Sequence, residues 1–124
     1  MGAETHPVPR ARILIVDDEP EVRMIVAEFL QDFGYQVLQA NGGVEALAHL
    51  QREAAVELLI TDIRMPEMSG IELADRATAR HPNLKVILIS GYFLAQRLHR
   101  RFLRKPFRMQ ELEAAIRAEL GRPG

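Results

Sequence analysis

Five polar residues stand directly after short apolar runs of this 124-residue sequence. They are Asp17, Asp18, Asp62, Ser90 and Lys105. If the fold gathers the three aspartates, two carboxylates about 4 Å apart repel by roughly 4 kcal/mol at an effective dielectric constant of 20. A cation is then needed for all three to stay ionised. Oxygen donors without histidine or cysteine favour Mg²⁺ or Mn²⁺, which binds one or two carboxylates together with phosphate oxygens.

The same residues could transfer a phosphoryl group to a carboxylate. Asp62 is the candidate nucleophile because it stands alone after its run, whereas the adjacent Asp17 and Asp18 suit a metal site. Lys105 offers a positive charge to phosphate oxygens, and Ser90 offers a hydroxyl. No histidine follows an apolar run to activate Ser90, which argues against a serine hydrolase. These residue types together predict an aspartyl phosphate.

The elements that must position these residues follow from the apolar pattern. Short β-branched runs that end at polar residues predict strands buried on both faces. The runs are residues 13–16, 35–40, 58–61, 86–89 and 102–104. Apolar residues at helical spacing predict helices between and after these strands. The helices are expected at residues 20–33, after a turn at residues 41–43 with Val44, Leu47 and Leu50 facing inward, at residues 69–80, and at residues 109–120.

Local residues mark the ends of these helices. Pro20 suits a first helical turn and Gly34 a left-handed C-terminal cap, while Ser69 and Glu72 have the spacing of a capping box. Because strands alternate with helices, we expect right-handed crossovers and a parallel sheet with helices on both faces. The carboxyl ends of such strands share one edge, where α/β sheets bind their ligands.

Four motifs follow these strands in order. They are Ile15 to Glu19, Thr61 to Pro66 with Gly70 eight residues after Asp62, Ile89 to Gly91, and Phe102 to Phe107. With these motifs, residues 12–120 resemble the receiver domain of two-component response regulators. The resemblance implies an α/β, three-layer (βα)5 flavodoxin-like fold with a five-stranded parallel sheet in the order 2-1-3-4-5. It also implies a phosphorelay, in which a sensor histidine kinase or a histidine phosphotransfer protein donates the phosphoryl group.

The resemblance also implies roles for the acidic residues. Asp62 would be the phosphoacceptor, in a Mg²⁺-dependent reaction. The metal ligands would be Asp17, Asp18, Asp62 and the backbone carbonyl of Arg64. The domain would catalyse only its own phosphorylation and dephosphorylation, and it would signal to a partner by changing conformation.

The remaining roles concern the phosphate and the switch. The resemblance implies that Ser90 and Lys105 contact the phosphate, that Phe102 is an aromatic switch, and that the peptide bond before Pro106 is cis. Arg64 and Tyr92 each lie two residues beyond a site residue. We therefore expect these two large side chains at the rim of the site, where they would slow attack by water.

The sequence departs from the receiver pattern between Ser90 and Phe102, where eleven residues leave too little room for a full fourth helix. We expect that helix to be short, irregular or missing. The nearby segment 97–108 is basic, through Arg97, Arg100, Arg101, Arg104 and Arg108. We expect this segment to attract an acidic protein partner. Nucleic acid is the less favoured partner, because aromatic residues are few there and the isoelectric point of the sequence is near 6.4.

Two other functions remain open at this stage. One is a Mg²⁺-dependent phosphohydrolase with an aspartate nucleophile, although such enzymes expect an Asp-x-Asp pattern that Asp62-Ile63-Arg64 lacks. The other is a nucleic-acid-binding regulator that uses residues 97–108. The choice between these functions and a receiver domain depends on the neighbours that the fold gives to Asp62.

Length and composition predict the organisation of the chain. We expect a flexible N-terminal arm at residues 1–11, one receiver domain at residues 12–121 and a tail at residues 122–124. Hydrophobic residues make up 48% of the sequence and cysteine is absent, so no disulfide framework forms. The sequence has no long apolar run. It therefore predicts a cytoplasmic protein without a membrane partner. We expect this protein to be a monomer or a weak dimer.

Overall fold

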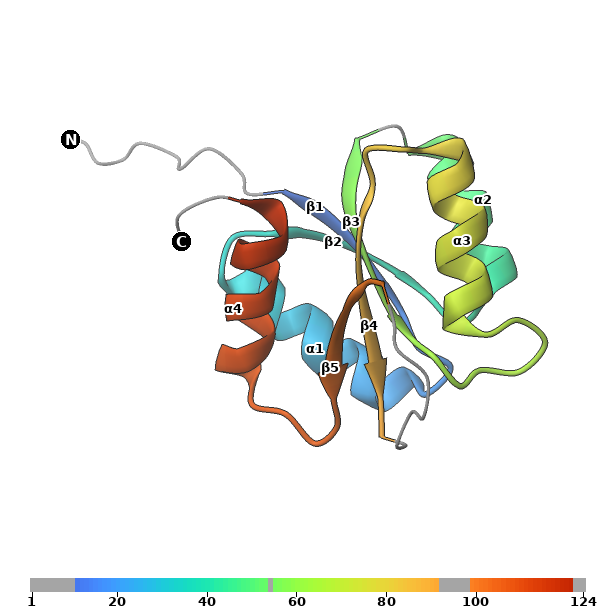
Figure 1. The fold of residues 1–124 in the computed structure, drawn as a ribbon. Helices are drawn as coiled ribbons and strands as arrows, with labels where there is room; N and C mark the ends of the chain where they lie inside the picture. The colour runs from blue at the N-terminus through green and yellow to red at the C-terminus, as the bar shows by residue number, and fades with distance from the viewer. Residues whose placement is uncertain (1–10, 54, 92–98, 122–124) are drawn as a thin grey trace.

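A computed structural model describes residues 11–53, 55–91 and 99–121 of the chain (Figure 1). Its strands are β1 Arg12–Val16, β2 Gln36–Ala40, β3 Val56–Asp62, β4 Lys85–Ser90 and β5 Arg101–Arg104. Its helices are α1 Pro20–Asp32, α2 Gly43–Arg52, α3 Gly70–Arg80 and α4 Met109–Leu120. The alternation of strands and helices predicted from the sequence is confirmed.

The five strands form one parallel sheet in the order β2-β1-β3-β4-β5. This order confirms the predicted 2-1-3-4-5 arrangement. Val16 at the end of β1 pairs with Ala40 of β2 and with Thr61 of β3, while Asp62 pairs with Ile89 of β4. Because the strands are parallel and in this register, their carboxyl ends lie together at one edge of the sheet.

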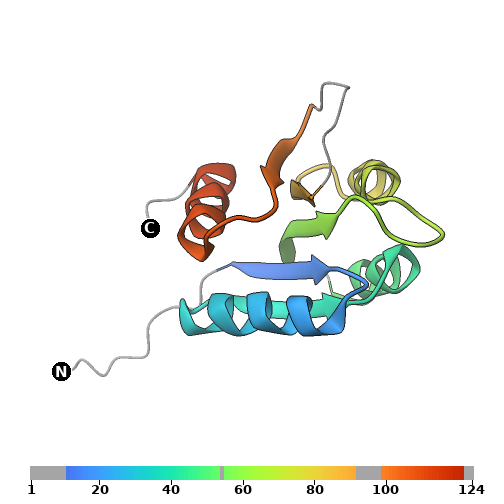
Figure 2. The same ribbon diagram turned by 90° about the horizontal axis from the view of Figure 1, so that it is seen from below.

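Successive side chains of the central strands point to opposite faces of the sheet, and each face has its own hydrophobic core. Helices α2 and α3 cover one face and helices α1 and α4 the other (Figures 1 and 2). The first core includes Leu14, Leu59, Leu88 and Leu73. The second includes Ile13, Ile60, Ile87, Leu30 and Leu112. The sheet is thus held between two apolar layers, which fixes the edge that carries the polar residues.

The helix ends show the expected local chemistry. Pro20 is the first residue of α1, and Gly34 follows that helix with a φ of 97°. The Ser69 hydroxyl accepts a hydrogen bond from the backbone N–H of Glu72 over 3.1 Å, which caps α3. Gly121 ends α4 in the left-handed conformation. Pro20 and Ser69 thus mark where α1 and α3 begin, while Gly34 and Gly121 mark where α1 and α4 end.

Some residues predicted to face inward do not. Val44 is 66% exposed, whereas Leu50 of the same helix is buried. Val44 is the second residue of α2, so its side chain faces the loops beyond the sheet edge, beside Asn41 and Pro66. The apolar stripe of α1 is similarly wider than its buried face, because Ile25 is 60% exposed.

The predicted shortening of the fourth helix falls on residues 92–98, which lie outside the described residues. Where the description resumes, β5 pairs with β4, and the Lys105–Pro106 peptide bond is cis, as expected. Across the described residues, none of the helices combines the length and apolar character that a membrane span requires.

Candidate functional site

Three aspartates meet at the carboxyl edge of the sheet. Asp17 and Asp18 follow β1, and Asp62 ends β3, the central strand. One carboxylate oxygen from each lies within 4.8 Å of the other two. Asp17 is buried, Asp62 is partly buried and Asp18 is exposed. A set of oxygen donors with one open side fits Mg²⁺, which keeps part of its water shell.

The backbone at the end of β1 is fixed by hydrogen bonds. The Asp17 N–H donates to the carbonyl of Ala40 over 3.2 Å, which extends the pairing with β2 by one residue. The Asp17 carboxylate accepts a hydrogen bond from the backbone N–H of Glu19 over 2.9 Å. These bonds hold the turn that presents Asp17 and Asp18 to Asp62.

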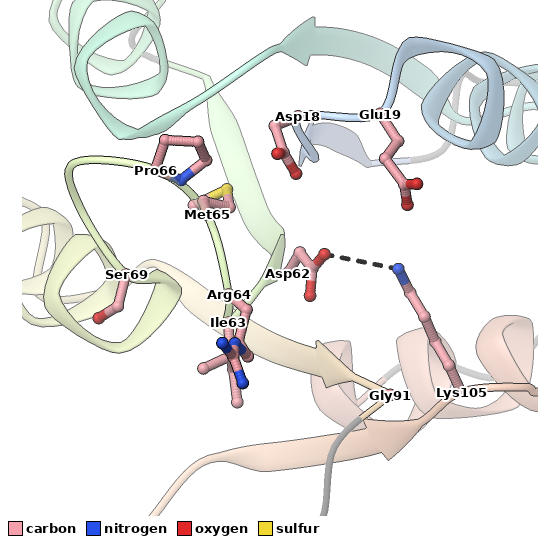
Figure 3. A pocket seen from close by; sticks show the side chains of 10 residues that line it. All are labelled: Asp18, Glu19, Asp62, Ile63, Arg64, Met65, Pro66, Ser69, Gly91 and Lys105. Atoms are coloured by element: carbon pink, nitrogen blue, oxygen red, sulfur yellow. Dashed lines mark hydrogen bonds and ion pairs between the residues drawn. The ribbon is translucent and has the colours of Figure 1, made fainter.

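Lys105 supplies a positive charge to the three acids. Its Nζ lies 3.6 Å from Asp17 Oδ2 and 3.5 Å from Asp62 Oδ2. Figure 3 shows the lysine reaching across the opening toward Asp62. The backbone N–H of Lys105 donates to the carbonyl of Ser90 over 2.8 Å, which joins the end of β5 to the end of β4. Lys105 thereby offsets part of the like-charge repulsion that the sequence predicted.

Burial and neighbouring charges act in opposite directions on Asp62. Burial raises the pKa of Asp62 above its ordinary 3.8, the charge of Lys105 lowers this pKa and the charge of Asp17 raises it, so that the pKa stays raised overall. For Lys105, burial lowers the pKa. The carboxylates of Asp17, Asp62 and Glu19 more than compensate and raise the Lys105 pKa above 10.5. The lysine is therefore charged at neutral pH.

A tight loop follows Asp62 and leads to α3. The Thr61 hydroxyl donates to the carbonyl of Asp62 over 2.9 Å and lies 3.9 Å from the Met65 sulfur. The backbone N–H of Gly70 donates to the carbonyl of Ile63 over 2.8 Å. A Cβ added to Gly70 would overlap the backbone carbonyl of Asp62, so only glycine fits this close approach. The loop thus fixes the position of the backbone carbonyl of Asp62, the proposed phosphoacceptor.

Asp18, Asp62 and Lys105 line a cavity of about 950 Å³. Its lining residues, drawn in Figure 3, come from the ends of four strands, β1, β3, β4 and β5, and the loops that follow them. They are Asp18, Glu19, Asp62, Ile63, Arg64, Met65, Pro66, Ser69, Gly91 and Lys105. The cavity has room for a phosphoryl group and part of its donor. Arg64 lies on this lining, and its roles at the rim and as a metal ligand through its carbonyl stay predictions.

The other predicted site residues lie in three different situations. Ser90 ends β4 and is fully buried, and its neighbour Gly91 lines the cavity. Phe102 is partly buried, pairs with Leu88 across the sheet and packs against the α2–α3 core. Tyr92 lies outside the described residues. The switch and rim roles of Ser90, Phe102 and Tyr92 stay predictions.

The basic segment has more acidic neighbours than the sequence suggested. Arg100 forms an ion pair with Asp75 of α3 over 3.2 Å, and Arg101 pairs with Glu119 of α4 over 2.8 Å. Arg104 and Arg108 are exposed, while Arg97 lies outside the described residues. The acids come from elements far away in the sequence, so local charge counting misses them. The acidic partner predicted for residues 97–108 stays a prediction.

Glu19 is a site residue that the sequence reasoning did not select. It lines the cavity, and its charge is one of the causes of the raised Lys105 pKa. Its position directly after Asp18 was the available signal, since it shares the turn after β1. Thr61 and Met65 were also missed as supports of the loop after β3, because their contact depends on the local path of the backbone.

Comparison with known proteins gives a consistent result. The Response regulator receiver domain family matches residues 13–117. The chain is 40% identical over 109 residues to the response regulator receiver protein CpdR of Brucella abortus (strain 2308), which covers 82% of this chain and 89% of CpdR. It is 36% identical over 118 residues to the sensor kinase CckA of the same organism, which covers 89% of this chain but 12% of that kinase.

Solved structures agree with the sequence relatives. The receiver domain of the hybrid histidine kinase CckA superposes with a TM-score of 0.78 at 34% identity, covering 89% of this chain and 99% of that domain. The response regulator TrrA of Thermotoga maritima, solved in complex with Mg²⁺ and BeF, superposes with a TM-score of 0.80 at 32% identity. That match covers 88% of this chain and 98% of TrrA.

Proposed function

The chain belongs to the response regulator receiver domain family of two-component systems, and on that premise we propose that Asp62 is its phosphoacceptor. The observation that supports this assignment best is the position of Asp62. It ends the central strand, lies within 4.8 Å of Asp17 and Asp18, and faces Lys105. The family is a signalling phosphoacceptor domain, so the proposed product is a phosphorylated form of the chain itself.

The proposed reaction moves one phosphoryl group. A carboxylate oxygen of Asp62 attacks the phosphorus of a phosphohistidine and forms an O–P bond. The N–P bond breaks, and its electron pair stays on the imidazole nitrogen of the donor. Hydrolysis of the acyl phosphate returns the aspartate and releases inorganic phosphate. Receiver domains bind Mg²⁺, and Mg²⁺ would supply positive charge to the phosphate oxygens during these steps.

The chain's own residues would orient and neutralise the phosphoryl group. Asp17, Asp18, Asp62 and the Arg64 carbonyl would hold the metal ion. Lys105 is already aimed at Asp62, so its ammonium can bind a phosphate oxygen with little movement. Ser90 would donate its hydroxyl to a second oxygen after a rearrangement, since its side chain is buried here. Arg64 and Tyr92 would restrict access of water.

We propose a histidine kinase or a histidine phosphotransfer protein as the donor. Two relatives motivate this class of partner. CckA is a sensor kinase, and the sporulation initiation phosphotransferase F of Bacillus subtilis (strain 168) is 36% identical over 81 residues of the chain. The organisation into an arm at residues 1–11, a receiver domain at residues 12–121 and a tail at residues 122–124 is part of the same proposal.

Intact-mass measurement tests the phosphoacceptor. The chain is incubated with acetyl phosphate and MgCl₂, with and without EDTA. We expect a gain of one phosphoryl mass that requires Mg²⁺ and is absent in Asp62→Asn. Asp75→Asn removes an exposed aspartate of α3 that lies outside the cavity and serves as the matched control. An adduct of unchanged yield in Asp62→Asn would show that another residue accepts the group.

A further inference from the structure

Arg23 connects α1 to the ends of two strands. It lies in the first turns of α1, where its Nη1 donates to the backbone carbonyl of Asp17 over 2.7 Å. Its Nε donates to the side-chain carbonyl of Gln39 in β2 over 3.0 Å. The planar guanidinium presents these two donors in a fixed arrangement, which a lysine cannot reproduce. Arg23 therefore joins the carboxyl ends of β1 and β2 from one position on the helix.

Hydrogen bonds from Arg23 also hold the turn after β1, at residues 17–19, in place. Its backbone N–H donates to the carbonyl of Glu19 over 3.0 Å, while its side chain holds the carbonyl of Asp17. The Asp17 N–H and carboxylate are already bonded to Ala40 and Glu19. The short segment from Asp17 to Glu19 is thus tied at both ends, and this segment carries two of the three acids of the proposed metal site.

We propose that Arg23 is a positioning residue of the metal site, which holds the carboxylates of Asp17 and Asp18 where they bind the cation together with Asp62. This inference rests on the proposed function. The charge of Arg23 by itself opposes a divalent cation, because like charges repel. The bond to the Asp17 carbonyl acts in the opposite direction, since it keeps the turn from reordering when the cation binds. The proposal is that positioning outweighs repulsion.

Another arginine offers a matched control at the opposite end of the same strands. Arg12 begins β1, donates to the Gln36 side chain of β2 over 2.8 Å and pairs with Glu53 over 3.0 Å. Like Arg23, it joins β1 to a glutamine of β2. Its partners lie at the amino ends of the strands, away from the acids. Removal of the Arg12 side chain therefore removes contacts that stabilise β1 against β2, but it leaves the hydrogen bonds of Asp17 unchanged.

The experiment measures MgCl₂ binding by titration calorimetry and thermal unfolding without metal. The variants are Arg23→Lys, Arg23→Met, Gln39→Leu and Arg12→Met. We expect Arg23→Met to weaken Mg²⁺ binding about tenfold, as loss of a residue that orients a metal ligand does elsewhere. Arg23→Lys keeps the charge but loses the paired donors, so it should weaken binding by about threefold or more. Gln39→Leu should have a smaller effect of the same sign.

Arg12→Met should leave the Mg²⁺ affinity within about twofold even where its melting temperature falls as far as that of Arg23→Met. Backbone hydrogen exchange without metal gives a second readout. The Asp17 and Glu19 amides should exchange faster in Arg23→Met but not in Arg12→Met.

Three results would overturn the inference. Tighter or unchanged Mg²⁺ binding by Arg23→Met would show that repulsion dominates or that positioning has no effect. Equal weakening of Mg²⁺ binding by Arg12→Met would show that Arg23 affects binding only by stabilising the fold in general. Unchanged binding by Arg23→Lys would show that charge alone suffices. Absence of Mg²⁺ binding by the unaltered chain would overturn the proposed metal site as well, which distinguishes the two failures.

Discussion

The carboxylate of Asp62 is under three influences whose signs can be tested separately. Burial and Asp17 raise its pKa, and Lys105 lowers it. In a titration of ¹³C-labelled protein without metal, the Asp62 carboxyl signal should give a pKa above 3.8. Lys105→Met should raise this pKa further, because the favourable charge is lost. Asp17→Asn should lower it. Shifts of the same sign in both variants would contradict the charge arrangement.

The same pKa has a consequence for stability that depends on pH. Folded Asp62 binds its proton more tightly than unfolded Asp62, whose pKa is near 3.8. The free energy of unfolding therefore falls as pH rises from about 3.8 through the folded pKa, and the loss persists at neutral pH. Without metal, the free energy of unfolding of Asp62→Asn minus that of the unaltered chain should therefore be larger at pH 7 than at pH 3. Urea unfolding at both pH values checks this, and a gain at pH 3 alone would refute it.

Asp18 tests whether the acids repel one another without metal. Its carboxylate lies within 4.8 Å of those of Asp17 and Asp62, the two acids with which Lys105 forms ion pairs. Asp18→Asn should raise the melting temperature in EDTA by about 2–4 °C and abolish Mg²⁺-dependent phosphorylation. Glu28→Gln removes one exposed acid in the middle of α1 and is the control for net charge. A fall of several degrees in Asp18→Asn would contradict mutual repulsion.

At the residue scale, the sequence predicted the acids and the lysine because strand ends can be recognised from short apolar runs. Asp17, Asp18, Asp62 and Lys105 meet as expected. The supporting contacts were not predictable in the same way. Arg23 contacts Asp17 and Gln39 through a long side chain, and its partners depend on the orientation in which α1 packs against the sheet.

At the scale of elements, the loop from β3 to α3 depends on one glycine. Gly70 lies against the backbone carbonyl of Asp62, where a Cβ has no space. Gly70→Ala should therefore destabilise the fold by about 1–3 kcal/mol and slow phosphorylation, because the backbone of Asp62, the proposed phosphoacceptor, must move. Gly42→Ala is the matched control, since a Cβ there meets nothing within 4 Å. Equal effects of the two variants, measured by urea unfolding and by acetyl phosphate labelling, would contradict this account.

Element boundaries were predicted closely where a local residue ends the element. Pro20 and Ser69 begin helices because their chemistry acts within one turn. The direction of a side chain in a first turn was not predictable. Val44 has the right spacing for the core, yet it lies beyond the edge of the sheet and is exposed. The pairing of Arg100 with Asp75 likewise joins elements 25 residues apart, which no local pattern encodes.

At the scale of the whole molecule, β5 is an edge strand of the sheet, and Lys105 of the site follows it directly. Its end is tied to β4 through Lys105 and Ser90, and Phe102 pairs with Leu88. If Lys105 and Ser90 move toward a phosphoryl group, β5 must respond. Addition of beryllofluoride and Mg²⁺ should therefore shift backbone amide signals at Asp62 and through residues 99–104.

The matched control for that experiment is Asp62→Asn, in which the same additions should leave residues 99–104 unshifted. The signals of α2 residues that do not line the cavity, such as His49, should change little in either protein. Shifts confined to the cavity lining in the unaltered chain would contradict transmission through β5. Two separate cores on the two sheet faces make a uniform response of the whole molecule unexpected.

The contact between Gly43 and Met68 makes the molecule unequally sensitive to oxidants. Met68 is buried with its sulfur against Gly43, where even a Cβ would have no space, whereas Met24 is 52% exposed. A peroxide should therefore convert Met24 to the sulfoxide before Met68, with little effect on the fold. An oxygen on the Met68 sulfur would push the start of α2 away from the loop after Asp62. Prolonged oxidation of this protein would then impair signalling once Met68 is oxidised, and the oxidation of Met24 would come earlier.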